Sequence, residues 1–153
     1  MSAFNAQPPL APRVHVITLG VADLERSLAF YRDGLGFPSE GIIGTEHHGD
    51  DVNPAGAAAR FELEDGLFLM LYPRVDLAKD AGVGLAAVAG SGHSLGHIVE
   101  SPQQVDRVLE LAQAVGGRVL APARQRPWGI YSGYFADPDG HLWEIICFVA
   151  QHE

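Results

Sequence analysis

The stretch Ser132-Gly-Tyr-Phe-Ala-Asp-Pro-Asp-Gly-His-Leu-Trp-Glu-Ile-Ile-Cys-Phe148 predicts a β-hairpin, and this hairpin decides the fold. Residues 137–140 form the turn, because proline fixes φ, aspartate bonds its own backbone and glycine accepts positive φ. In the strand that follows, Leu142, Glu144 and Ile146 share one face. A carboxylate among apolar residues is costly to bury without a partner, so Glu144 is the first indication of a functional site.

Composition limits the kind of protein that carries this hairpin. The 153 residues, 47% of them hydrophobic, are enough for one compact domain. The net charge of −9 disfavours nucleic acid and anionic membrane as partners and leaves a cationic or neutral small ligand open. The single cysteine, Cys147, excludes an internal disulfide and indicates a reducing compartment. With no targeting segment and no apolar run of 18 residues, we expect a cytoplasmic protein without a membrane span.

The first half of the chain predicts one strand, one helix and three strands. Residues 1–12 contain three prolines and are expected to be a flexible arm. Residues 13–21 are rich in β-formers, and Asp23 is a helix N-cap. The helix ends at Gly34 and Gly36. Three short strands are expected at 41–46, 57–64 and 67–72, and the polar loop 45–56 between the first two is a candidate lid. The first unit thus spans 13–74.

The second half repeats this order after a connector at 75–92. A strand at 93–99 leads to Ser101 and Gln104, which form a capping box around Pro102 at the first helical position. The helix ends at Gly116-Gly117. Short strands at 118–120 and 131–136 precede the last strand of the hairpin. The second unit spans 93–150, and both units share one domain.

The spacing within the two halves also agrees, which indicates an internal duplication. Val16 precedes Gly36 by 20 positions, and His97 precedes Gly117 by the same number. On this alignment Val16 is the counterpart of His97.

The two hairpins give a second match. Gly66 precedes Met70 by four positions, as Gly140 precedes Glu144, so Met70 is the counterpart of Glu144. We therefore predict an α+β fold of tandem βαβββ units, whose curved sheets form a cup with the helices outside. Such a cup is a natural cavity for a small ligand.

Two motifs resemble those of the vicinal oxygen chelate superfamily, which includes glyoxalase, fosfomycin-resistance, bleomycin-resistance and extradiol dioxygenase proteins. The first is V-A-D-L-E-R-S-L-A-F-Y at 21–31, followed by L-G-F at 35–37. The second is G-Y-F-A-D-P-D-G-H-L-W-E at 133–144. The resemblance covers about residues 13–148 and implies this fold. It also implies a homodimer, whose subunits pair their sheets and in some members build each cup from both chains.

The resemblance further implies a metal site, since metal-dependent members take their ligands from the first and last strands of each unit. His97 and Glu144 match this pattern as ligands for Zn²⁺, Mn²⁺, Fe²⁺ or Ni²⁺ and are expected to face the cup. Val16 and Met70 offer no donor atom, and His15 is offset by one residue to the opposite face. The alternative is a hydrogen bond between His97 and Glu144 that satisfies two buried polar groups.

The predicted ligand pocket combines cup-facing strand positions with aromatic walls. Its residues are Val16, Thr18, Met70, His93, Trp128, Tyr131 and Tyr134. At ~3.3 Å per residue, His93 lies about 13 Å from His97 and does not share a metal with it. The histidines at 47 and 48 are attributed to a polar loop.

Two functions follow from this pattern. The first is a metal-assisted lyase, isomerase or oxygenase acting on a small oxygen-bearing molecule, with Glu144 as metal ligand and base. The alternative is a metal-free protein that binds and sequesters a small, antibiotic-like molecule, as in the bleomycin-resistance branch. Val16 and Met70 favour the alternative, because apolar groups pack against a ligand and do not hold an ion.

Overall fold

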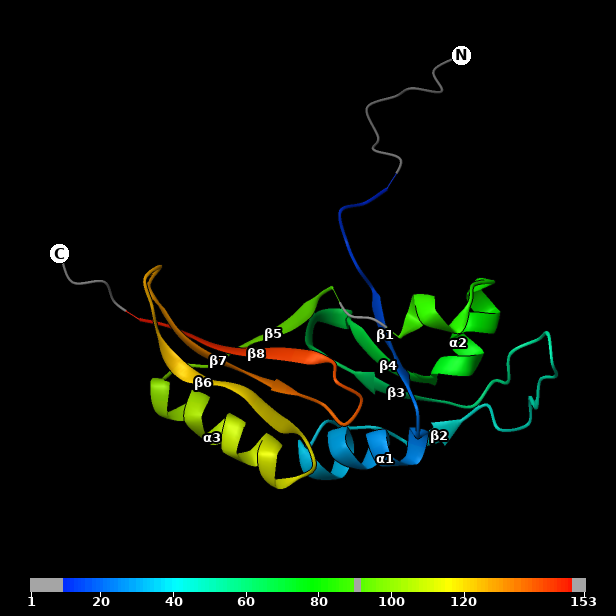
Figure 1. Ribbon diagram of the computed structural model, residues 1–153, viewed down its shortest axis with the longest axis horizontal. Coiled ribbons are helices and arrows are strands. Elements are labelled where there is room, and N and C mark those ends of the chain that lie inside the picture. Colours follow the sequence, from blue (N-terminus) through cyan, green and yellow to red (C-terminus); the bar gives the residue numbers. More distant parts are fainter. Residues whose placement is uncertain (1–9, 90–91, 150–153) are drawn as a thin grey trace, which may run out of the picture.

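A computed structural model describes residues 10–89 and 92–149 (Figure 1). Most of the predicted arm, two residues of the connector and residue 150 lie outside this range. The elements are β1 (Val16–Val21), α1 (Leu24–Leu28), the π-helix η1 (Ala29–Gly34), β2 (Ile42–Ile43), β3 (Ala58–Glu62), the 3₁₀ turn η2 (Glu64–Gly66), β4 (Phe68–Pro73), α2 (Arg74–Ala81), η3 (Leu85–Val88), β5 (Ser94–Ile98), α3 (Pro102–Ala114), β6 (Arg118–Arg126), β7 (Ile130–Ala136) and β8 (Leu142–Phe148).

The strands form two four-stranded sheets with the same topology. The first has the order β1-β4-β3-β2 and the second β5-β8-β7-β6. In each sheet the first strand of the unit pairs in parallel with the last, and the other pairs are antiparallel. The predicted α+β fold of tandem βαβββ units is confirmed. The two sheets remain separate in the described part of the chain.

One face of each sheet is covered by helices, as Figure 1 shows for α1 and α3. Residues alternate between this helix-side face and the opposite face of the sheet, which we call the outer face. Leu71 of β4 and Ile145 of β8 point to the helix side and are therefore buried in the core. Cys147 is buried there too. The outer face carries the intervening residues, among them Met70 and Glu144, which are half-buried.

The β7–β8 turn joins the two repeats. The Asp139 side chain is 1% exposed, and it accepts hydrogen bonds from the Ala22 amide at 2.9 Å and the Ser27 hydroxyl at 2.8 Å. Its Oδ1 also lies 3.1 Å from Arg26 Nη2 and 3.4 Å from Arg74 Nη2. A carboxylate of the second repeat therefore satisfies the start of α1 and two cations of the first repeat.

Tyr31 completes this joint inside the core. Its hydroxyl donates to Asp137 Oδ2 at 2.7 Å and accepts from Trp143 Nε1 at 3.0 Å. Burial, followed by the charge of Asp137, raises the pKa of Tyr31 well above its usual range. The phenol therefore stays protonated and links η1 to both sides of the second hairpin.

The candidate lid, loop 45–56, is tied to α2 and β4. Lys79 Nζ donates to the Asp50 carbonyl at 2.8 Å, and the Ala55 amide donates to Asp76 Oδ1 at 2.9 Å. Hydrogen bonds from Asn53 lower the pKa of Asp50 to about 2. These contacts hold the loop at the edge of the first repeat. Among the described residues, no helix is long and apolar enough to cross a membrane.

Candidate functional site

His97 and Glu144, the predicted pair of ligands, lie on opposite faces of the second sheet. The register pairs Gly96 with Glu144 and His97 with Ile145. Because paired residues of a parallel ladder share a face, Glu144 is on the outer face and His97 on the helix-side face. His97 is nevertheless exposed, since α3 packs on β6, β7 and β8 and β5 is the edge strand. The expectation that both side chains face one cup is wrong.

The physical reason is a difference in length between the two helical segments. Leu19 lies four residues before the N-cap Asp23, and His97 lies four residues before the N-cap Ser101. The caps therefore make Leu19 the counterpart of His97, and the strand registers agree. The first segment, from Asp23 to Gly36, is three residues shorter than the second, from Ser101 to Gly117. Alignment of the repeats on these glycines therefore shifts the first strand by three residues relative to its true counterpart. A shift by an odd number of residues moves a side chain to the other face of the sheet.

Glu144 instead belongs to a polar group on β6, β7 and β8, which we call the Glu144 cluster: Glu144, Ser132, Tyr134 and Arg126. The Ser132 hydroxyl donates to Glu144 Oε2 at 2.9 Å, and Tyr134 lies opposite Glu144 in the β7–β8 register. Arg126 Nη2 donates to the Ser132 carbonyl at 3.4 Å. Alternate residues of adjacent strands thus bring a carboxylate, two hydroxyls and a guanidinium together.

The electrostatics of the cluster centre on Tyr134. Burial raises the pKa of its phenol, the charge of Glu144 and a hydrogen bond to Glu144 raise it further, and Arg126 partly offsets this. The phenol is therefore a hydrogen-bond donor at neutral pH. Arg126 Nε is buried and has no hydrogen-bond partner among the described residues. Such a group is uncommon in folded proteins, because an unpaired buried N–H costs free energy.

The chemistry open to the cluster is hydrogen bonding and proton exchange at a carboxylate. An ionised carboxylate offers about four acceptor positions, and the bond from the Ser132 hydroxyl occupies one of them. Sequence reasoning named Glu144 and Tyr134 but missed the role of Ser132. The signal was present, because positions 132 and 134 share a face in any regular strand.

The other predicted pocket residues are divided between the two sheets. Val16, Thr18 and Met70 lie on the outer face of the first sheet, where the register pairs Thr18 with Met70. They do not line a site with Glu144 within one sheet. They lie on the face of the sheet that the sequence predicts, and their part in a pocket stays a prediction.

Three predicted pocket residues lie elsewhere. Tyr131 points to the helix-side face, where its hydroxyl donates to Asp106 of α3 at 2.8 Å, so its place in the pocket is wrong. Trp128 is 65% exposed in the β6–β7 turn, and His93 is exposed just before β5. The roles of these last two stay predictions. His141, at the end of the β7–β8 turn, contacts the Gly20 carbonyl through Nε2 at 2.8 Å.

The residues present do not fit a divalent metal. Val16 and Met70 carry no nitrogen or oxygen donor in their side chains, and His97 lies across the sheet from Glu144. Within residues 10–89 and 92–149 no three His, Cys, Asp or Glu side chains are grouped so that they hold an ion. Catalytic zinc usually has about three protein ligands. The donor set of the described residues falls short of that number.

Comparisons with known proteins agree with this fold. The family model of the Glyoxalase/Bleomycin resistance protein/Dioxygenase superfamily matches residues 13–145. A glyoxalase-related enzyme from Fulvimarina pelagi is 33% identical, with a TM-score of 0.72 over 90% of this chain and 88% of that chain. A glyoxalase/bleomycin resistance protein/dioxygenase from Nocardioides is 25% identical, with a TM-score of 0.68 over 94% and 88%.

A more distant structure shares the fold. A single-residue mutant of the genomically encoded fosfomycin resistance protein FosX from Listeria monocytogenes, solved with Mn(II) and 1S,2S-dihydroxypropylphosphonic acid, is 21% identical, with a TM-score of 0.58 over 89% of this chain and 90% of that chain. No curated protein matches the chain.

Proposed function

The chain belongs to the glyoxalase/bleomycin resistance protein/dioxygenase superfamily, and we propose that it binds a small organic molecule at the Glu144 cluster without a metal held by its own residues. One observation carries this proposal: of the four positions expected to supply ligands, only Glu144 presents a donor on an outer face. A carboxylate without companion ligands binds N–H and O–H groups better than it holds an ion.

The surroundings of the cluster suit such a ligand. Ile98 and Ile146 are paired on the same outer face and supply apolar contact beside the polar group. Ile98 is 61% exposed and is therefore free to be covered. A few convergent polar groups set in apolar surface are typical of small-molecule sites. The carboxylate of Glu144 and the acidic chain favour a cationic or neutral ligand over an anionic one.

We also propose that a second copy of the chain covers part of the outer faces. Val16 is 47% and Phe148 67% exposed on the two sheets. Exposed apolar side chains of this kind are common where protein surfaces associate. Light scattering tests this: a homodimer is expected, and Phe148→Asp is expected to weaken it. A monomer at all concentrations would remove the proposal.

The metal-assisted reaction is the second candidate, and FosX is a structure of this fold that was solved with Mn(II). That likeness, at 21% identity, shows the fold alone. Because the donors within residues 10–89 and 92–149 do not fit a metal, we assign no chemical step to one. His97, on the helix-side face, has no assigned part in either function.

Metal content separates the two candidates. Protein stripped of metal and dialysed against Zn²⁺, Mn²⁺, Fe²⁺ or Ni²⁺ is expected to retain far less than one equivalent, and Glu144→Gln is expected to behave like the wild type. One equivalent of metal that Glu144→Gln loses would establish the metal-assisted candidate and overturn ours. His97→Ala is the matched control.

Ligand binding is tested with three probes of one size: benzylamine, benzyl alcohol and benzoate. Amide resonances of Gly96 and Tyr134 report on the cluster, and benzylamine is expected to shift them at the lowest concentration, since it pairs with the carboxylate. Glu144→Gln should remove that preference, whereas His97→Ala should keep it. Equal responses to all three probes in the wild type would contradict Glu144 as the anchor.

A further inference from the structure

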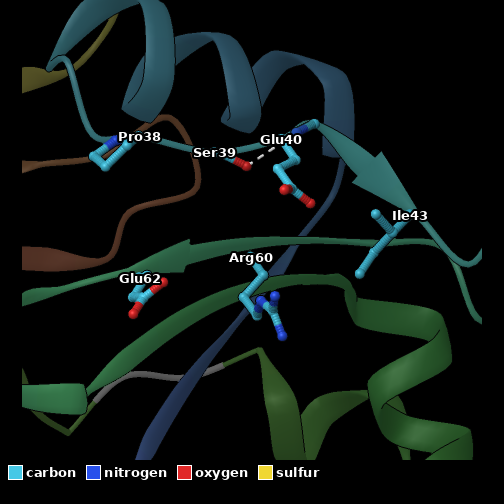
Figure 2. Close-up of a pocket in the computed structure, with 7 residues that line it drawn as sticks. Pro38, Ser39, Glu40, Ile43, Arg60 and Glu62 are labelled. Carbon is cyan, nitrogen blue, oxygen red and sulfur yellow. Dashed lines mark hydrogen bonds between the residues drawn. The ribbon is translucent and has the colours of Figure 1, made fainter.

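A separate cavity of about 530 Å³ lies at the edge of the first sheet (Figure 2). It is lined by Pro38, Ser39, Glu40, Gly41, Ile43, Arg60 and Glu62. All of these residues belong to β2, β3 or the loop before β2, whereas the Glu144 cluster belongs to the second sheet. The volume falls in the range of small-molecule sites.

Arg60 is the cation of this cavity. It lies on β3, and its guanidinium carbon is 5.1 Å from the centre of the Phe68 ring. Contact with an aromatic face orients the guanidinium without consuming its N–H donors. No carboxylate of the described residues lies within ion-pair distance of Arg60. The donors therefore remain available for an anionic group.

Two carboxylates border the same space. Glu62 follows Arg60 by two residues on β3 and so shares its face. Glu40 comes from the loop, and Figure 2 shows its side chain above Arg60 with Ile43 beside them. Neither glutamate forms an ion pair with a described residue. Three charges of both signs thus border one cavity without a direct ion pair among them.

The loop that carries Glu40 has a defined shape. The Gly41 amide donates to Ser39 Oγ at 3.2 Å, and Gly41 has φ +102, a conformation that glycine adopts readily and other residues rarely do. This turn directs the chain into β2, so that Ile43 forms an apolar wall that is 44% exposed. The cavity therefore has a fixed backbone wall opposite β3.

We propose that this cavity binds a small zwitterion, with its anionic group on Arg60 and its amine between Glu40 and Glu62. A molecule with a single charge is attracted by one part of this cavity and repelled by another, since an anion on Arg60 meets the two glutamates and a cation between the glutamates meets the guanidinium. A molecule with both charges pairs with all three side chains, and a carboxylate matches the fork of a guanidinium. Its aliphatic spacer lies against Ile43. The inference is independent of the function proposed for the Glu144 cluster.

The test uses γ-aminobutyrate, which carries both charges, and two matched probes that carry one each, butyrate and butylamine. Amide shifts of Gly41 and Ile43 report binding. We expect γ-aminobutyrate to half-saturate at a concentration about fivefold below either single-charge probe, as one added exposed ion pair gives. Arg60→Gln should abolish this advantage. Arg107→Gln, an exposed arginine of α3, should leave it intact.

A second variant guards against simple loss of structure. Glu62→Gln should weaken the binding of γ-aminobutyrate and strengthen the binding of butyrate, because it removes a negative charge and keeps the size of the side chain. A gain in butyrate affinity cannot come from misfolded protein. Two results would overturn the proposal. One is butylamine that binds as tightly as γ-aminobutyrate, and the other is no shift at Gly41 and Ile43 with any probe up to about 100 mM. Shifts at Gly96 and Tyr134 report separately on the Glu144 cluster.

Discussion

The hairpin turns of the two repeats occupy equivalent places and have different tasks. The β3–β4 turn is exposed and contains Asp65 at φ +61. The β7–β8 turn buries Asp139, whose carboxylate holds the start of α1 in the other repeat. The comparison teaches that a duplicated hairpin keeps its length and strand register while one copy becomes the joint of the molecule.

The outer faces of the sheets differ in the same way. Met70 pairs with Arg60 across β3 and β4, and Glu144 pairs with Tyr134 across β7 and β8. At matched positions the first sheet thus presents a thioether and a cation, and the second a carboxylate and a phenol. The repeats share a scaffold, but each offers its own binding chemistry.

The largest expected effect comes from breaking the joint with Asp139→Ala. The Ser27 hydroxyl, which is buried, and the Ala22 amide then lose their acceptor, while Arg26 and Arg74 are partly exposed and regain water. We expect the free energy of unfolding to fall by about 2 to 4 kcal/mol, measured by urea denaturation.

The matched control for this variant lies in the other turn. Glu64→Ala changes an exposed residue of η2 and should alter the free energy of unfolding by less than about 0.5 kcal/mol. Equal losses in the two variants would show that the turns do not differ as the structure indicates.

A smaller loss is expected from Tyr31→Phe, which removes one hydroxyl from the joint. Asp137 and the indole N–H of Trp143 each lose a partner in the core, at a cost of about 1 to 3 kcal/mol. Tyr72→Phe is the control: its hydroxyl donates to the Ala55 carbonyl but is only partly buried. Urea denaturation should rank Tyr31→Phe as the less stable variant, and the reverse order would contradict the buried joint.

The joint also shows what the sequence predicts and what it does not. Asp137-Pro138-Asp139-Gly140 and the capping box at Ser101 are local signals, so the hairpin, the long helix and the repeated order of strands were predicted correctly. The bond from the Ala22 amide to Asp139 spans 117 positions. Nothing local marks such a contact, and it appears only when the two repeats pack.

The candidate site was predicted in part for a similar reason. Strand parity alone places Met70 and Glu144 on outer faces, and the structure agrees. The face of His97 depends on register across the whole unit, which the unequal helical segments disturb by an odd number of residues. Local periodicity fixes the face within one strand but does not fix the alignment of two repeats.

Glu144→Gln tests the difference between the two outer faces, and we expect it to have little effect on the free energy of unfolding. Loss of the carboxylate charge should lower the pKa of Tyr134 toward its usual value, while burial still holds it somewhat above. The phenol should therefore ionise at lower pH in the variant, as followed by NMR titration of the tyrosine ring. Met70→Gln, the equivalent position in the first sheet, should leave the titration of Tyr134 unchanged, and a shift there would contradict the separation of the two faces.

The smallest expected effect concerns the exposed turn itself. Asp65 has φ +61 and ψ 25, a left-handed conformation that aspartate tolerates and glycine adopts without strain. In Asp65→Gly the relief of strain is offset by the greater freedom of glycine in the unfolded chain, so a gain of no more than about 0.5 kcal/mol is expected. Asp65→Ala keeps the strain and loses the polar side chain, and should cost about 1 kcal/mol. Thermal denaturation of the three proteins should rank glycine, aspartate and alanine in falling order. Alanine as stable as glycine would show that the first turn does not hold the left-handed residue on which its contrast with the β7–β8 turn depends.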